Sequence, residues 1–151
     1  MYDVKPIAKV INDRKEILDD NWGNIISIIE LNDDIPVESL LEIESFSHLE
    51  ILFIFHQVPE EKIIYGARHP RNNQNWSKVG IFAQRGKNRP NKIGTTIVEL
   101  IKKEGRRLYV RQLDAIDGTP IIDIKPVMRE FLPNKEIKQP EWSSELMKNY
   151  W

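Results

Sequence analysis

The chain has 151 residues, carries a formal net charge of −1 and contains no cysteine. This length corresponds to about one ordinary domain, which can bury a hydrophobic core without metal ions or disulfides. The absence of cysteine excludes a disulfide framework, a thiolate nucleophile and the usual structural zinc sites, and it fits the reducing environment of a cytoplasmic protein.

The charges are segregated along the chain. Residues 13–61 contain 13 acidic and 2 basic side chains, whereas residues 62–111 contain 13 basic and 2 acidic ones. The second segment therefore has an excess of 11 positive charges, which indicates a polyanion as partner if even half of them share one face. The alternative is that the acidic and basic halves pack against each other or against a second subunit.

The first half of the chain predicts three strands and one short helix. Residues 4–10 and 24–31 are rich in Ile and Val and are bounded by Asp, Asn and Gly, which is typical of strands. Residues 36–44 place a proline in a first turn ahead of three aliphatic residues, which predicts a short helix. Residues 49–58 are the most hydrophobic stretch, and we expect them to form the centre of the sheet.

The second half predicts a polar loop followed by more short strands. Residues 67–78 are rich in Asn and nearly free of aliphatic side chains, so we expect a surface loop. Four further apolar runs predict strands at residues 79–84, 95–101, 108–113 and 120–124. The second and third of these runs should form a hairpin with Gly105 at its turn.

Seven short strands with little amphipathic helix between them favour an antiparallel barrel or sandwich, a mainly β fold. We expect this domain to occupy residues 1–133. We expect residues 134–151 to form a polar linker and a C-terminal tail. A short helix in this tail could dock through four apolar side chains: Trp142, Leu146, Tyr150 and Trp151.

The absence of several common motifs excludes several classes of protein. The three histidines, His48, His56 and His69, form no helical pair and no cluster with carboxylates, so we expect no metal site. A nucleophile elbow, a P-loop and a Gly-x-Gly-x-x-Gly dinucleotide motif are all missing. The chain also lacks a signal-peptide pattern and any run of roughly 18 apolar residues, so we expect no association with a membrane.

Three stretches resemble the signature of one protein family. They are ESFSHLEILFIFHQ at residues 44–57, GIFAQRGKNRPNKIGTTIVEL at residues 80–100 and LDAIDGTPIIDIKP at residues 113–126. All three are similar to stretches of the TsaA/TrmO family of tRNA methyltransferases, and the similarity is spread over roughly residues 4–132.

The resemblance implies a compact antiparallel β-barrel that works as a homodimer and binds S-adenosylmethionine without a Rossmann fold. It also implies methylation of the exocyclic nitrogen of a threonylcarbamoyladenosine next to the tRNA anticodon. The basic half suits tRNA, because phosphate contacts provide most of the affinity for RNA. Two other functions stay open: a non-catalytic module that binds RNA or a nucleoside, and a methyltransferase with the same cofactor that acts on a small metabolite.

The resemblance implies a set of site residues as well. The implied cofactor contacts are Asn21, Trp22, His56, Gln57, Arg85, Thr95, Asp114, Ile116, Asp117, Gly118 and Thr119. Among them, Asp114 and Asp117 are the expected acceptors for ribose or amine groups. The expected tRNA contacts are Arg68, Arg71, Lys87, Arg89 and Asn91. No catalytic residue is assigned, although a carboxylate or His56 could accept the proton of the methylated nitrogen.

Some of these residues also have a purely structural interpretation. His56 could be a hydrogen-bonded residue at the end of a strand. Residues 117–120 have a composition typical of a turn, and residues 89–91 could simply fix a loop. The chain departs from the family pattern at Lys92 and at residues 86–88. Because these positions border the implied pocket, they bear on the choice of substrate more than on cofactor binding.

Overall fold

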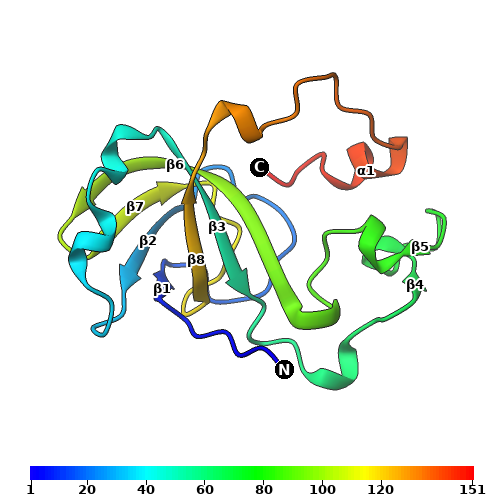
Figure 1. Cartoon of the computed structure of the whole chain (residues 1–151). Helices are drawn as coiled ribbons and strands as arrows, with labels where there is room; N and C mark the ends of the chain where they lie inside the picture. The colour runs from blue at the N-terminus through cyan, green and yellow to red at the C-terminus, as the bar shows by residue number, and fades with distance from the viewer.

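A closed barrel of six antiparallel strands forms the body of the molecule, described by a computed structural model of residues 1–151 (Figure 1). The strands are β1 (Ala8–Ile11), β2 (Ile26–Leu31), β3 (His48–Ile54), β6 (Ile93–Glu104), β7 (Arg107–Arg111) and β8 (Pro120–Pro126). Their order around the barrel is β1-β2-β7-β6-β3-β8, and β8 pairs with β1 to close it. The predicted mainly β fold and antiparallel barrel are therefore confirmed.

The core fills the barrel with aliphatic side chains from alternate positions of the strands. In β3, Leu49, Ile51 and Phe53 are buried, while the residues between them face outward. This strand pairs with β6 on one side and β8 on the other, but the predicted central position has no counterpart, because every strand of a closed barrel has two neighbours. The strand ends at Ile54, however, because the backbone turns at residues 56–57.

The predicted hairpin joins β6 to β7. Gly105 lies at its turn with φ of +58°, in the left-handed region that glycine adopts without the steric cost of a Cβ atom. A register shift near Leu100 adds a bulge to β6, and such bulges increase the local twist of a strand.

Two predicted elements are of another type in the structure, and the strand predicted at residues 4–10 begins only at Ala8. Residues 36–44 form no α-helix but a 3₁₀ turn at Val37–Leu40, and a second turn follows at Ile43–Ser45. Between them Glu42 adopts φ of +69°, which interrupts a right-handed helix. Residues 79–84 contribute no barrel strand: only Val79–Gly80 is extended, and a 3₁₀ turn follows at once.

The segment between β3 and β6 leaves the barrel and lies beside it (Figure 1). It contains the two-residue strands β4 (Ala67–Arg68) and β5 (Val79–Gly80), which pair with each other. The chain after β8 runs away from the barrel to the helix α1 (Glu141–Leu146), which lies next to this segment, and the C-terminal end then turns back toward the barrel. No helix of the structure has the length and apolar character that crossing a membrane requires.

Candidate functional site

The carboxylate of Asp114 is the centre of a cluster drawn from distant parts of the chain. Thr96 of β6 donates its hydroxyl hydrogen to one carboxylate oxygen, and Tyr150 of the C-terminal tail donates to the other. Burial, the negative charge of Asp114 and the hydrogen bond to it raise the pKa of the Tyr150 phenol, so this group stays protonated. The positive charges of Arg85 and Arg71 act in the opposite direction on the pKa of the same phenol.

The N-terminal loop with Asn21 and Trp22 borders this cluster. Trp22 is almost completely buried, and the guanidinium carbon of Arg14 lies 3.9 Å from the centre of its ring. The backbone N–H groups of Asn21 and Trp22 donate to the carbonyl oxygens of Asn149 and Tyr150 at 2.9 and 2.7 Å. The C-terminal tail is thus held against two residues of the predicted cofactor site.

Arg71, a predicted tRNA contact, and Arg85, a predicted cofactor contact, are each fixed by contacts within the protein. Arg71 forms an ion pair with Asp20 at 3.0 Å and lies 3.9 Å from a carboxylate oxygen of Asp19. Arg85 donates through Nη2 to the carbonyl oxygen of Thr95 at 2.6 Å. The hydroxyl of Thr95 itself donates to a carboxylate oxygen on β3 at 3.2 Å, so it is not a partner of Asp114.

Residues 116–119 form a turn whose polar groups are bound within the protein. The backbone N–H of Asn12 donates to Oδ1 of Asp117 at 3.0 Å, and Nζ of Lys15 lies 3.1 Å from Oδ2. The hydrogen bond from Asn12, followed by the contact with Lys15, lowers the pKa of Asp117. Thr119 is buried and donates its hydroxyl to the carbonyl oxygen of Ile116 at 2.7 Å. Gly118 has φ of +82°.

The side chains of His56 and Gln57 are exposed on the turn that follows β3. No hydrogen bond joins either side chain to Asp114 or to its partners. Tyr150 and its neighbour therefore connect Asn21 and Trp22 with Asp114, Arg71 is tied to the N-terminal loop, and Arg85 is tied to the backbone of Thr95 beside Thr96. Residues 116–119 contact the N-terminal loop through Asp117, and no hydrogen bond links the His-Gln pair to these groups.

The comparison with protein families decides to which group the barrel belongs. Residues 20–131 match the tRNA-methyltransferase O N-terminal domain. The chain belongs to this family. The matched range starts just before the Asn21–Trp22 loop and ends after β8, so it includes every strand of the barrel except β1.

Individual relatives agree with the family. A mouse protein named tRNA (adenine(37)-N6)-methyltransferase is 42% identical over 64% of this chain and 22% of its own length. A putative S-adenosylmethionine-dependent methyltransferase of Pseudomonas aeruginosa is 46% identical over 60% of this chain and 38% of its own length. The crystal structure of TrmO from P. aeruginosa superposes with a TM-score of 0.75 at 28% identity, over 94% of this chain and 62% of that one. The chain thus spans well under half the length of both sequence relatives.

The predicted tRNA contacts of this TrmO-family chain lie on the segment beside the barrel. Arg68 donates to the side-chain oxygen of Asn72 at 3.0 Å, and Lys87 is half-buried. Arg89 donates to the carbonyl oxygen of Gln84 at 2.7 Å, so its guanidinium group fixes its own loop. Asn91 is exposed on a turn with φ of +64°, and Arg71 is the arginine already paired with the N-terminal loop.

Part of the basic excess is neutralised inside the molecule. Four basic residues of the segment 62–111 form ion pairs with acidic residues of the segment 13–61: Arg71, Lys92, Lys103 and Arg107. The two halves therefore do pack against each other in part, as one of the two sequence interpretations expected. Arg68 and Lys87 take part in no ion pair and keep their charge available to an outside anion.

Sequence reasoning missed Thr96 and Arg14. Strand alternation could have identified Thr96, because Val98 faces the core and residues two apart share a face. Arg14 had no comparable signal, since its position over Trp22 depends on how an irregular loop folds. Its Nε atom is buried and has no hydrogen-bond acceptor.

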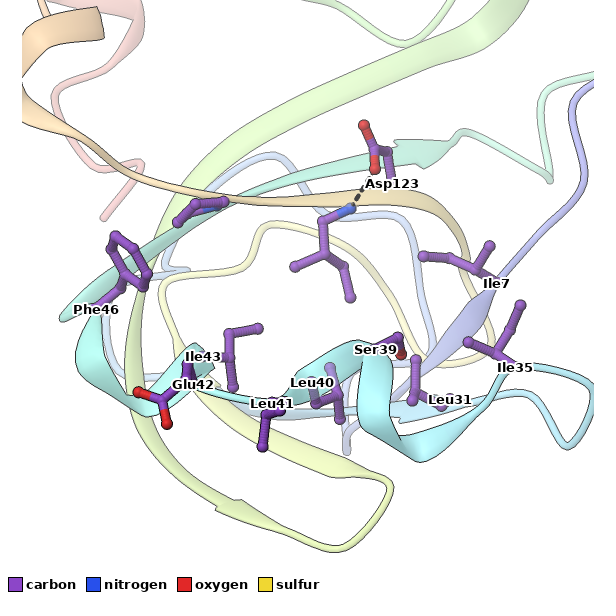
Figure 2. Close-up of a pocket in the computed structure, with 12 residues that line it drawn as sticks. Ile7, Leu31, Ile35, Ser39, Leu40, Leu41, Glu42, Ile43, Phe46 and Asp123 are labelled. Atoms are coloured by element: carbon purple, nitrogen blue, oxygen red, sulfur yellow. Dashed lines mark hydrogen bonds between the residues drawn. The ribbon is translucent and has the colours of Figure 1, made fainter.

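A separate cavity of about 350 Å³ lies at one end of the barrel (Figure 2). Figure 2 shows that aliphatic side chains of the two 3₁₀ turns, among them Leu40 and Ile43, face Ile7 and Leu31 across it. None of its lining residues is a predicted site residue. The structure also brings no three His, Asp or Glu side chains into an arrangement that could hold a metal ion.

Proposed function

We propose that this chain binds S-adenosylmethionine and methylates the exocyclic nitrogen of threonylcarbamoyladenosine beside the tRNA anticodon. The observation that carries the proposal is the family match over residues 20–131, together with the mouse relative whose name gives methylation of a tRNA adenine. The remaining expectations, a homodimer in the cytoplasm with tRNA as partner, belong to the same proposal.

The chemistry of the Asp114 cluster suits this cofactor, whose sulfonium supplies the methyl group. A carboxylate that already accepts two hydroxyl hydrogens suits the hydroxyls of a ribose or an ammonium group. Trp22 lies buried beside this cluster under the guanidinium group of Arg14, and the buried Nε of Arg14 is a donor that lacks an acceptor. We therefore place the cofactor next to Asn21, Trp22, Arg85 and Asp114.

The residues of the chain would act mainly by binding and orientation, because a sulfonium is already a good leaving group. A base near neutral pKa serves best for proton transfer at physiological pH. Asp117 is poorly suited to that role, because its contacts with Asn12 and Lys15 lower its pKa. Asp114 and His56 remain the candidates for proton acceptor.

For the RNA, we propose that Arg68 and Lys87 contact phosphates from the segment beside the barrel. Neither is neutralised by a carboxylate, and phosphate contacts of this kind position an RNA without reading its bases. The substrate nucleoside would then be selected by the residues around Asp114.

The decisive experiment incubates the protein with S-adenosylmethionine labelled in its methyl group and total tRNA, then digests the RNA and identifies the labelled nucleoside by mass spectrometry. We expect label in threonylcarbamoyladenosine. Label in a different nucleoside, or none despite measured cofactor binding, would refute the proposed substrate.

A second candidate is a methyltransferase that acts on a small metabolite. The Pseudomonas relative is compatible with it, since its name specifies the cofactor and no substrate. This candidate predicts no measurable affinity for tRNA and no effect of replacing Arg68 and Lys87. A non-catalytic RNA-binding module instead predicts tRNA binding that falls steeply with salt and does not change when S-adenosylmethionine is added.

A further inference from the structure

We propose that residues 149–151, the C-terminal strap, occupy the place of the cofactor and have to leave before it binds. The inference rests on the proposed function, because it takes Asn21, Trp22 and Asp114 as cofactor contacts. The strap would then set the affinity of the site from within the chain, as an internal competitor.

Each proposed contact is already used by the strap. The backbone N–H groups of Asn21 and Trp22 donate to the carbonyl oxygens of Asn149 and Tyr150. The hydroxyl of Thr96 donates to one carboxylate oxygen of Asp114, and the hydroxyl of Tyr150 donates to the other. A phenol hydroxyl and a ribose hydroxyl are equivalent donors to a carboxylate, so the two compete for the same oxygen.

The strap is also positioned to be released as a unit. It follows α1 through a series of turns, and outside these turns its hydrogen bonds go only to the N-terminal loop and to Asp114. The helix itself is tied to the segment beside the barrel by a separate bond, from Nε1 of Trp76 to a carboxylate oxygen of Glu145 at 2.8 Å. Release of residues 149–151 therefore leaves this anchor in place.

Gly23 provides a way to open the strap without removing any hydrogen-bonding group. A Cβ atom built on Gly23 would lie 2.6 Å from the carbonyl carbon of Trp151, closer than nonbonded atoms approach. Since that neighbour is backbone rather than a flexible side chain, the end of the strap has to move in a Gly23→Ala variant. The Tyr150→Phe variant weakens the strap differently, by removing only the hydroxyl on Asp114.

The test measures the dissociation constant of S-adenosylmethionine by calorimetry for the full chain and these two variants. A hydrogen bond to a charged group changes an equilibrium constant by about tenfold or more. Because a closed site lowers the apparent affinity by the fraction of open molecules, we expect Tyr150→Phe to bind roughly tenfold more tightly. Gly23→Ala should shift the constant in the same direction.

Two matched variants serve as controls. Tyr2→Phe removes a hydroxyl from a side chain that is fully exposed, and Gly66→Ala adds a Cβ atom where nothing lies within 4 Å. Neither should change the dissociation constant. Thermal unfolding of all four variants establishes that each is folded before the titration.

The outcomes separate the strap from the proposed function. Tighter binding by both strap variants than by the unchanged protein supports competition by the strap. Binding by both strap variants, with none by the unchanged protein, supports it as well. If the unchanged protein binds the cofactor and both strap variants bind equally or more weakly, the strap is refuted while the cofactor site stands. Absence of binding by every form overturns the cofactor site and the strap together.

Discussion

Replacement of Asp117 by alanine tests whether this residue anchors the N-terminal loop. The change leaves the backbone N–H of Asn12 without its acceptor, which costs about 1 to 3 kcal/mol for a fully buried group. The ion pair with Lys15 adds little, because the Lys15 side chain is 73% exposed and such surface pairs contribute about 0 to 1 kcal/mol. Since the site is only partly buried, we expect a loss of about 1 to 2 kcal/mol in the free energy of unfolding at pH 7.

The loss should depend on pH in a defined direction. The contacts with Asn12 and Lys15 lower the pKa of Asp117 in the folded state below its value of about 3.9 in an unfolded chain. The stabilisation by the ionised carboxylate is therefore complete above about pH 4 and disappears as the pH falls through the lowered pKa. The difference between the unchanged protein and Asp117→Ala should be constant from pH 7 to about 5 and should shrink below about pH 4.

Urea denaturation of both proteins at pH 7, 5 and 3 measures these differences directly. A Lys15→Ala variant serves as control and should lose less than about 1 kcal/mol, because it leaves the bond from Asn12 intact. An Asp117→Ala variant that is as stable as the unchanged protein at pH 7, or whose deficit is the same at pH 3, would refute the anchoring role.

Three further predictions concern the core, the RNA and the oligomer. Gly94→Ala should destabilise the barrel by about 1 to 3 kcal/mol in urea, because its Cβ atom would lie 2.6 Å from the ring of buried Phe53, whereas Gly66→Ala should be neutral. Replacement of Arg68 or Lys87 by alanine should weaken tRNA binding in filter assays. It should also reduce the slope of log affinity against log salt by about one for each phosphate that is no longer neutralised, and an unchanged slope would exclude the proposed phosphate pairing. Light scattering should give twice the mass of the chain, and a monomeric mass at micromolar concentration would contradict the homodimer.

The barrel strands could be predicted because short runs of β-branched and bulky apolar residues, bounded by turn residues, are typical of strands. In β3 the alternate burial of Leu49, Ile51 and Phe53 is visible only in the structure, because apolar residues also occupy positions between them. The strand predicted at residues 79–84 was wrong, because this apolar run forms a surface turn and does not pair with the barrel. Ile81 is buried there, but Phe82 is 77% exposed. An apolar run by itself does not reveal whether a partner strand exists.

The candidate site was predicted less completely than the barrel, because its members meet through irregular segments. The resemblance identified Asn21, Trp22 and Asp114, and the structure places all three at one cluster. The link between them is Tyr150, whose contact depends on the path of the chain after β8. No periodicity or motif encodes that path, since it is set by tertiary contacts such as the one between Trp76 and Glu145.

Asp114 and Asp117 show how the same side chain takes different roles three residues apart. Asp117 binds a backbone N–H, a partner that is fixed by the fold, and its exchange for a ligand would unravel the turn into β8. Asp114 binds only side-chain hydroxyls, one from a barrel strand and one from the strap, and the second can be replaced without breaking the sheet. If the site binds a ribose, its hydroxyls should therefore reach Asp114, and Asp114→Asn should weaken cofactor binding more than Asp117→Asn does.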